Sequence, residues 1–209
     1  MNPRFFASLS LCALLAGCGS NTDQEGLLAP IQASLSGLIG GGPPVTDAAT
    51  IRAALTPEVR AQFGNRPLKI AVLEKSKQAS LLIESERNRD VVTFITPDGA
   101  TVSLRSGVIV ATRGLGFDLM SADVSDVTRA LRNGGGDATR IHRYLDGEDQ
   151  VVILSLVCDI VGGATLTETC YGDGIKITNT YRGRGTGTYA ASRQWIGPER
   201  GYLRLEPAE

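Results

Sequence analysis

The sequence predicts a mainly β protein, either an antiparallel β-sandwich or a curved, partly closed barrel with a few short helices. From Leu68 onward, apolar and polar residues alternate with a period of two in a series of short segments. Turn residues such as the "PDG" at 97–99 separate neighbouring segments by only a few positions. Short connections indicate antiparallel pairing, because parallel strands need long crossovers.

The predicted strands share this alternation and are rich in β-branched residues. They cover residues 68–73, 79–85, 91–96, 100–104, 107–116, 138–146, 150–158, 164–170, 174–182, 186–195 and 202–207. One helix is expected among them, over "SADVSDVTRALRNGGG" at 121–136. Ser121 or Asp123 would be its N-cap, and Gly134 would end it.

A helical segment at 26–64 is predicted ahead of the β domain at 65–209. Apolar residues at 27–39 have the spacing of one helix face. Two short helices are expected nearer its end, the second running from an N-cap at Thr56 to a stop at Gly64. Such apolar faces suit either a sheet surface or the plane of a bilayer, and the sequence leaves both open.

The N-terminus has the layout of a secretory signal, since Arg4 precedes an uncharged apolar run that ends in small residues. The run is shorter than the about 20 apolar residues that a transmembrane helix needs. Its end, "LAGC" at 15–18, resembles the lipobox of bacterial lipoprotein precursors, in which the cysteine thiol receives a diacylglyceryl group and the signal is cut just before it. We therefore expect residues 1–17 to be removed, Cys18 to carry the lipid, and residues 18–25 to form a flexible tether.

The residues after Cys18 bear on which membrane holds the chain. In lipoproteins of this kind an aspartate after the cysteine favours retention at the inner membrane, and here Gly19 and Ser20 follow. The resemblance therefore implies the outer membrane, on its periplasmic side. Fatty acyl chains such as palmitate, at ~0.8 kcal/mol per buried methylene, would give an anchor that does not readily dissociate.

Two cysteines remain for the folded domain once the leader and the lipid site are set aside. Cys158 and Cys170 lie twelve residues apart, on either side of a turn at Gly162-Gly163. In an oxidising periplasm such a pair predicts a disulfide across a hairpin, worth roughly 3 kcal/mol. A tetrahedral zinc site is the rival, but two cysteines and one distant histidine do not fill its shell, so no metal is expected.

Charge and motifs narrow the classes of function. The 21 basic and 22 acidic residues nearly balance and form no basic stripe, which argues against nucleic acid as a partner. The single histidine, His142, shares a predicted strand face with Arg140 and Tyr144, and we expect an ordinary strand histidine, since a general base needs a nucleophile or an orienting carboxylate beside it. The glycine-rich segments at 132–137 and 182–189 lack the lysine and hydroxyl of a phosphate loop. We therefore expect no enzyme activity and no cofactor other than the lipid on Cys18.

The C-terminal hairpin contains the most distinctive side chains. Trp195, the single tryptophan, and Tyr202 flank a turn, with Arg193 and Gln194 just before it. Aromatic, arginine and glutamine side chains together often bind sugars or a loop of a partner protein, so these four are candidate binding residues. The alternative is a hairpin whose aromatic ring buries about 200 Å² in the core.

Several stretches resemble the YjbF/GfcB family of group 4 capsule and exopolysaccharide lipoproteins. They are "RSGVIVATRGLGFDLMSAD" at 105–123, the strand ending at Cys158, "TNTYRGRGTGTYAASRQW" at 178–195 and the closing hairpin "IGPERGYLRLEP" at 196–207. This resemblance implies an outer-membrane lipoprotein of a Gram-negative bacterium that assists polysaccharide assembly or export, with secretion proteins or the polysaccharide as partners.

Three functions follow from these observations, in order. The first is a non-enzymatic accessory lipoprotein in capsule or exopolysaccharide export. The second is a periplasmic lipid- or glycan-binding module on a curved sheet, and an apolar cavity between the sheet and the helices of 26–64 would favour its lipid-binding form. The third is a glycan-modifying enzyme, which requires a cleft with two facing carboxylates.

Overall fold

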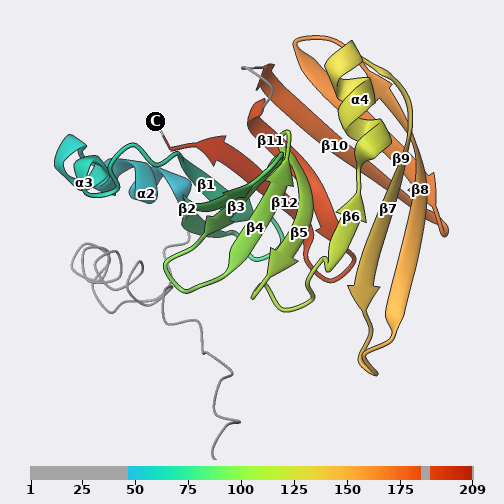
Figure 1. The fold of residues 1–209 in the computed structure, drawn as a ribbon, viewed down its shortest axis with the longest axis horizontal. Coiled ribbons are helices and arrows are strands. Elements are labelled where there is room, and N and C mark those ends of the chain that lie inside the picture. Colours follow the sequence, from blue (N-terminus) through green and yellow to red (C-terminus); the bar gives the residue numbers. More distant parts are fainter. Residues whose placement is uncertain (1–46, 185–188, 209) are drawn as a thin grey trace, which may run out of the picture.

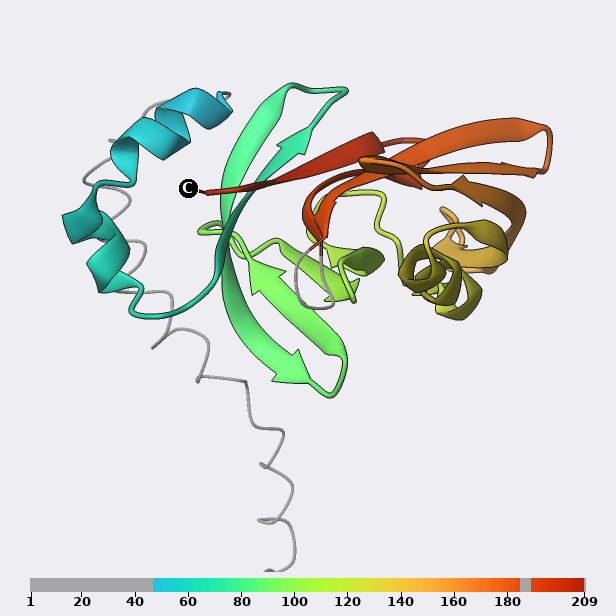
Figure 2. The ribbon, with the colours of Figure 1, turned by 90° about the horizontal axis from the view of Figure 1, so that it is seen from above.

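The computed structural model describes residues 47–184 and 189–208, and twelve strands of this part form one antiparallel sheet. In chain order they are β1 (Leu68–Leu73), β2 (Gln78–Asn88), β3 (Val91–Ile95), β4 (Thr101–Arg105), β5 (Val108–Arg113), β6 (Ser121–Asp123), β7 (Gly136–Leu145), β8 (Val151–Val161), β9 (Thr165–Gly172), β10 (Ile175–Arg184), β11 (Tyr189–Gly197) and β12 (Gly201–Pro207). The strands lie in the order β5-β4-β3-β2-β1-β12-β11-β10-β9-β8-β7-β6. The sheet curls until it is nearly closed, which confirms the mainly β class and favours the barrel over the sandwich (Figures 1 and 2).

The two edge strands of the sheet are neighbours in the chain, and the link between β5 and β6 brings them together. The N–H of Thr112 donates to the carbonyl of Leu119 at 2.9 Å, and the N–H of Met120 donates to the carbonyl of Arg143 on β7 at 2.9 Å. These bonds satisfy edge groups that would otherwise be free.

Gln194 of β11 closes the sheet from inside. Its amide oxygen accepts the N–H of Ile109 on β5 at 2.9 Å, and its amide nitrogen donates to the carbonyl of Gly107 at 2.8 Å. The same nitrogen donates to Ser192 Oγ at 2.9 Å, and the side chain is fully buried. The side-chain amide of Gln194 therefore makes two of the hydrogen bonds that a neighbouring strand would make with the backbone at β5.

Two short helices, α2 (Ala48–Ala54) and α3 (Pro57–Gln62), cover the outer face of β1 and β2 (Figure 2). Asp47 caps α2, and Thr56 caps α3 as predicted. The helices and strands form a small second core of Ile51, Leu55, Val59, Phe63, Ile70, Val72, Ala79, Leu81 and Ile83. No helix of the described residues is long and apolar enough to cross a membrane.

The alternation of β1 separates the two cores. Ile70 and Val72 face the helices, whereas Ala71 and Leu73 face the interior of the curled sheet. The helices therefore lie on the sheet, as one of the two expectations for them required. The predicted leader, Cys18, the tether and the apolar face at 27–39 lie outside the described residues.

The third described helix, α4 (Ser125–Asn133), is shorter than the predicted 121–136 helix. Residues Ser121–Asp123 instead form β6, because their backbone pairs with β7. Asp123 still supports the helix start, since its carboxylate accepts the N–H of Ser125 at 3.0 Å, although Val124 occupies the N-cap position. Gly134 ends the helix at a φ of 85°, as predicted.

The closure by Gln194 gives a first prediction. Replacing it in Gln194→Leu preserves the volume but leaves the Ile109 N–H and the Gly107 carbonyl buried without partners. We expect the free energy of unfolding in urea to fall by about 2–4 kcal/mol. Gln62→Leu, at an exposed position on α3, is the control and should change it by less than about 0.5 kcal/mol. A loss below 1 kcal/mol for Gln194→Leu would show that the closure does not depend on this amide.

Candidate functional site

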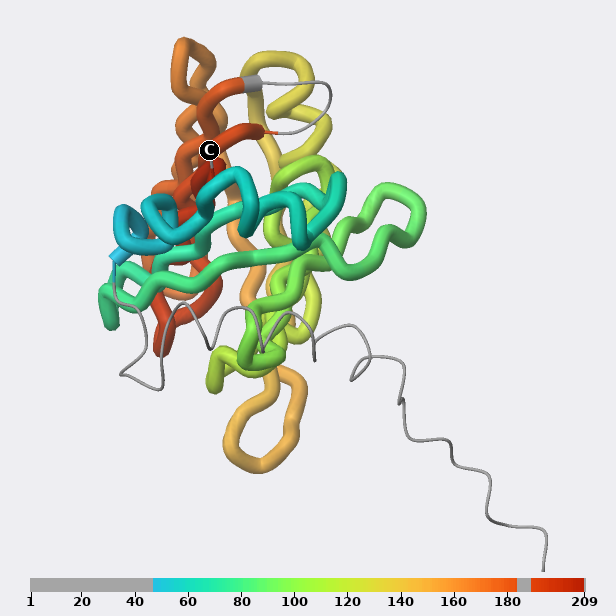
Figure 3. Tube along the Cα trace, turned by 90° about the vertical axis from the view of Figure 1, so that its left-hand side faces the viewer, coloured from blue at the N-terminus to red at the C-terminus, as the bar shows by residue number. Residues whose placement is uncertain are grey.

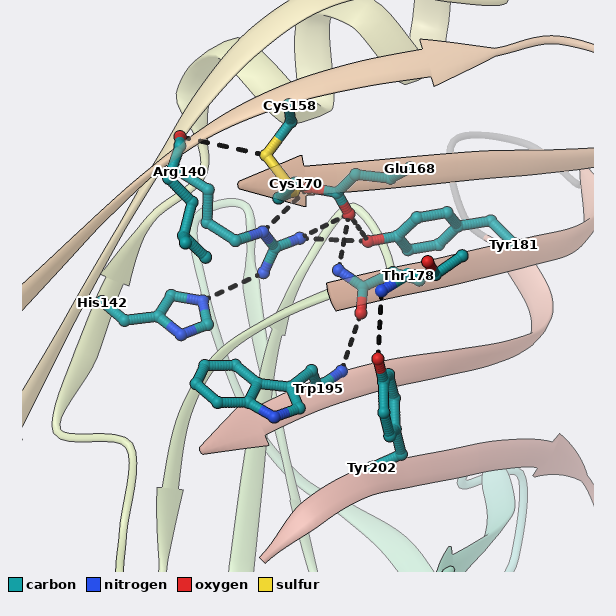
Figure 4. Close-up of a disulfide and its surroundings, with 11 residues drawn as sticks. Arg140, His142, Cys158, Glu168, Cys170, Thr178, Tyr181, Trp195 and Tyr202 are labelled. Atoms are coloured by element: carbon teal, nitrogen blue, oxygen red, sulfur yellow. Dashed lines mark hydrogen bonds and ion pairs between the residues drawn. A yellow bond between two sulfur atoms is a disulfide. The ribbon is translucent and has the colours of Figure 1, made fainter. Parts of the chain in front are cut away.

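A buried cluster of polar side chains lies inside the curled sheet, between β7, β9 and β10 (Figure 4). Alternation along β7 points Arg140, His142 and Tyr144 to the interior, as their shared face in the sequence predicted. Glu168 of β9 and two residues of β10, Asn179 and Tyr181, complete the cluster. Arg140 and Glu168 have no exposed surface.

The centre of the cluster is a bidentate ion pair. Nε and Nη2 of Arg140 donate to the two carboxylate oxygens of Glu168, each at 2.9 Å. The Tyr181 hydroxyl donates to Glu168 at 2.7 Å and accepts from Arg140 Nη2 at 3.0 Å. Asn179 adds a donor to the same carboxylate at 2.8 Å. A buried charge pair is tolerated when geometry and further hydrogen bonds satisfy it in this way.

His142 extends the cluster toward β11. Its Nε2 lies 3.2 Å from Arg140 Nη1, which can act only as a donor, so Nε2 is the acceptor. Nδ1 therefore carries the hydrogen and donates to the Tyr144 hydroxyl at 2.8 Å, which donates in turn to the Ile196 carbonyl at 3.1 Å. The imidazole also stacks on Trp195, with ring centroids 5.7 Å apart.

The electrostatics hold each group in one protonation state. Burial, and then the Arg140 charge, lower the pKa of His142 well below its usual value, so the ring stays neutral. Burial and the Glu168 carboxylate raise the pKa of Tyr181. Burial alone would lower the pKa of Arg140, but the Glu168 carboxylate outweighs it and raises the value. These groups hydrogen-bond to one another, so the cluster links β7, β9 and β10.

The predicted disulfide between Cys158 and Cys170 lies beside this cluster, on directly opposite residues of β8 and β9. Sγ of Cys170 lies 3.4 Å from Glu168, which is a contact and not a hydrogen bond, because a disulfide sulfur carries no hydrogen. The two cysteines and Glu168 lie within 4.8 Å of one another. They do not make a metal site in this state, since the sulfurs are bonded together and the carboxylate is paired with Arg140.

Two of the four candidate binding residues, Arg193 and Tyr202, form a half-buried pair. Arg193 forms an ion pair with Glu74 at 2.9 Å, and its guanidinium lies 3.4 Å above the Tyr202 ring. Arg193 Nη1 donates to the Thr178 carbonyl at 3.1 Å, and the Tyr202 hydroxyl accepts the Thr178 N–H at 3.0 Å. Both side chains thus form hydrogen bonds with the backbone of β10.

The other two candidates lie in the core, so the four do not form one exposed surface. Gln194 is the closing amide, and Trp195 packs on His142. The backbone N–H of Trp195 donates to Asn179 Oδ1 at 2.8 Å, where the β10–β11 pairing stops at Thr180–Arg193. Trp195 is buried in the core, which is the alternative that the sequence left open for this hairpin.

Sequence reasoning missed Glu168 and Asn179. The alternation of β9 could have identified Glu168, because it places this residue on the same buried strand face as Leu166 and Cys170. A lone carboxylate on a buried face requires a buried cation. Arg140, which lies on the inner face of β7 opposite to the face of Ile141, is that cation.

Taken together, the fold and the cluster define a curled antiparallel β domain held by a buried ion pair and a disulfide. Residues 51–207 match the family model described as group 4 capsule polysaccharide lipoprotein GfcB, YjbF, and the chain belongs to this family. The crystal structure of the hypothetical lipoprotein YmcC from Escherichia coli K12 superposes with a TM-score of 0.58 at 15% identity, covering 66% of this chain and 84% of that chain. At this identity the likeness shows a shared fold. No curated protein matches the chain.

The ion pair gives a second prediction. Glu168→Leu leaves the Arg140 charge buried without a counterion, and we expect a loss of about 3–5 kcal/mol in the free energy of unfolding. The double variant Arg140→Leu/Glu168→Leu should lose less than the two single variants summed, because it removes both charges. Arg87→Leu breaks an exposed pair with Glu84 and should cost at most about 1 kcal/mol. Additive losses in the double variant would contradict direct coupling.

The neutral His142 gives a third prediction, in the pH dependence of stability. In the unfolded chain His142 takes up a proton near pH 6.5, whereas in the folded protein its lowered pKa keeps it neutral. Stability is therefore lost as the pH falls below 6.5. Relative to His142→Gln, the wild type should lose roughly 1.5–2 kcal/mol between pH 6.5 and 5 in urea titrations. Parallel pH curves for the two proteins would refute this assignment.

Proposed function

We propose that the chain is a lipoprotein held by Cys18 at the periplasmic face of the outer membrane, where it assists the assembly or export of capsule polysaccharide or exopolysaccharide. It acts by contact with a secretion protein and not by chemistry. Family membership supports the polysaccharide and the lipid anchor. The locked core cluster supports a structural use of its titratable side chains.

One observation carries the contact role. All the exposed large hydrophobic side chains of the described residues lie on β8, at the end of β9 and at the start of β10: Val151, Val152, Ile153, Val157, Val161, Tyr171 and Ile175. Val157 is 70% exposed at the middle of β8. Scattered apolar residues need no explanation, but a set concentrated on three consecutive strands of a sheet is typical of interaction sites. We call this set the β8 surface.

The surface continues onto a hairpin that protrudes from the body of the molecule. The β7–β8 hairpin extends beyond the neighbouring strands (Figure 3). Val151 and Val152 point to opposite faces of it and both are exposed, so its end is apolar on two sides. Its turn carries the exposed acids Asp146, Glu148 and Asp149.

These features specify the chemistry of the partner. A hairpin that is apolar on both sides fits a groove of another protein better than a flat surface. The acidic turn favours a groove with a basic rim, and it disfavours an anionic membrane surface. The partner we propose is therefore a protein of the secretion machinery with an apolar groove flanked by lysine or arginine.

The alternative of an acyl-chain carrier is less well supported. A cavity between the sheet and the helices of 26–64 would favour it, and at the described helices α2 and α3 that space is filled by Leu55, Val59 and Phe63 packed on Ile83 and the neighbouring strand residues. The glycan-binding form of the alternative is compatible with the accessory role.

A complementation experiment tests the proposal. In a strain lacking this gene, wild-type chain should restore secreted polysaccharide, and Val157→Asp should not, because a buried charge disrupts an apolar contact. Ala53→Asp, which adds the same charge at an exposed position of α2, should restore it. Both variants must reach the membrane at wild-type levels. Full restoration by Val157→Asp would remove the β8 surface from the function.

The anchor is tested in the same strains. Fatty-acid labelling and membrane fractionation should find label on the wild type in the outer membrane and none on Cys18→Ser. Soluble, unlabelled wild-type protein would contradict the lipoprotein assignment at this cysteine.

A further inference from the structure

A small cavity opens on the inner face of β1, β2 and β4, bounded by the loop after β5 and the turn before β12. Its volume is about 160 Å³, below the about 300–1,000 Å³ of pockets that hold drug-sized ligands. The floor is apolar, with Leu82, Val102 and Leu203. Among the polar lining residues are Asp98 and Arg200. The cavity is thus amphipathic and has room for a single small ring.

Arg200 places a guanidinium at this cavity. Its Nε is buried and has no hydrogen-bond partner among the described residues. Arg105 and Arg204 also have a buried Nε, but each faces a carboxylate, of Asp90 at 2.9 Å and of Glu206 at 2.6 Å. An unpaired buried N–H on a charged group is costly, so it points to a ligand.

The chain makes room for this guanidinium at Gly116. That glycine has a φ of 99°, and a Cβ there would collide with Nη2 of Arg200. Gly114, the neighbouring lining residue, lies close to Ala100, where a Cβ would approach the Ala100 Cα to 3.2 Å. The loop after β5 is therefore shaped to let Arg200 lie against it.

We propose that this cavity binds one carboxylate-bearing sugar residue, with Arg200 as the group that recognises the carboxylate. The proposal rests on the proposed function and specifies the kind of polysaccharide unit that the chain contacts. A planar guanidinium matches a carboxylate with two parallel hydrogen bonds. Asp98, which is exposed, accepts sugar hydroxyl hydrogens, and its charge opposes a phosphate dianion more strongly than a carboxylate. The apolar floor takes the C–H face of the ring.

Binding to the purified full-length chain in detergent tests the site. The probe is methyl β-D-glucuronide, with methyl β-D-glucoside as its neutral counterpart, observed by saturation-transfer NMR. We expect a Kd of about 1 mM for the glucuronide, which corresponds to one ring and one ion pair, and at least tenfold weaker binding of the glucoside. Arg200→Gln should lose the glucuronide signal at equal concentration.

Two further variants separate recognition from folding. Arg204→Gln alters an arginine of the same hairpin that is paired with Glu206, and it should bind like the wild type. Gly116→Ala should weaken binding with Arg200 still present, because the added methyl displaces the guanidinium. Thermal melting of each variant checks that the fold is retained.

Each result decides the proposal. Equal binding of both glycosides, tighter binding of glucose 6-phosphate, or preferential binding of hexanoate would overturn the carboxylated-sugar assignment. Unchanged binding by Arg200→Gln would overturn the role of this residue. No binding of the glucuronide at 50-fold the expected Kd would overturn the site, whereas the proposed function is judged separately by Val157→Asp, which leaves this cavity unaltered.

Discussion

The ion pair between Arg140 and Glu168 is the interaction on which the rest of the interior depends. It joins β7 to β9 across β8, and Glu168 then orients Tyr181 and Asn179 of β10. The Asn179 side chain accepts a backbone N–H of β11 at the point where regular pairing between β10 and β11 stops. Each polar group in this chain of hydrogen bonds is paired with the next. Removing either charge would therefore leave unpaired polar groups on several strands in the buried interior.

The same cluster explains where the candidate binding residues of the C-terminal hairpin lie. Arg193 and Trp195 have the same parity in the chain, and regular alternation would put them on one face. The interrupted pairing at Thr180–Arg193 lets Trp195 enter the core while Arg193 stays near the surface with Glu74. Side chains replace the missing backbone bonds there, since Tyr202 and Arg193 bind the two backbone groups of Thr178.

Features that depend on local pattern could be predicted from the sequence, and features that depend on register and curvature could not. Alternation predicted the strands and the shared face of Arg140, His142 and Tyr144, and the spacing of Cys158 and Cys170 predicted their disulfide. The pairing of Arg140 with Glu168 requires the register of two hairpins. The reach of Gln194 to β5 requires the full curl of the sheet, because these residues lie 85 positions apart in the chain.

The closed edge also limits how this protein can assemble. The backbone groups through which β5 could accept another strand are occupied, Ile109 by Gln194 and Thr112 by Leu119, and β6 at the other edge is only three residues long. Recruitment by strand addition, which lets many β proteins polymerise or capture extended peptides, is therefore blocked at both ends of the sheet. For the described part of the chain, the side chains on the faces of the barrel are then the remaining surface for contact with another protein, where specificity is set by shape and charge and not by the generic backbone.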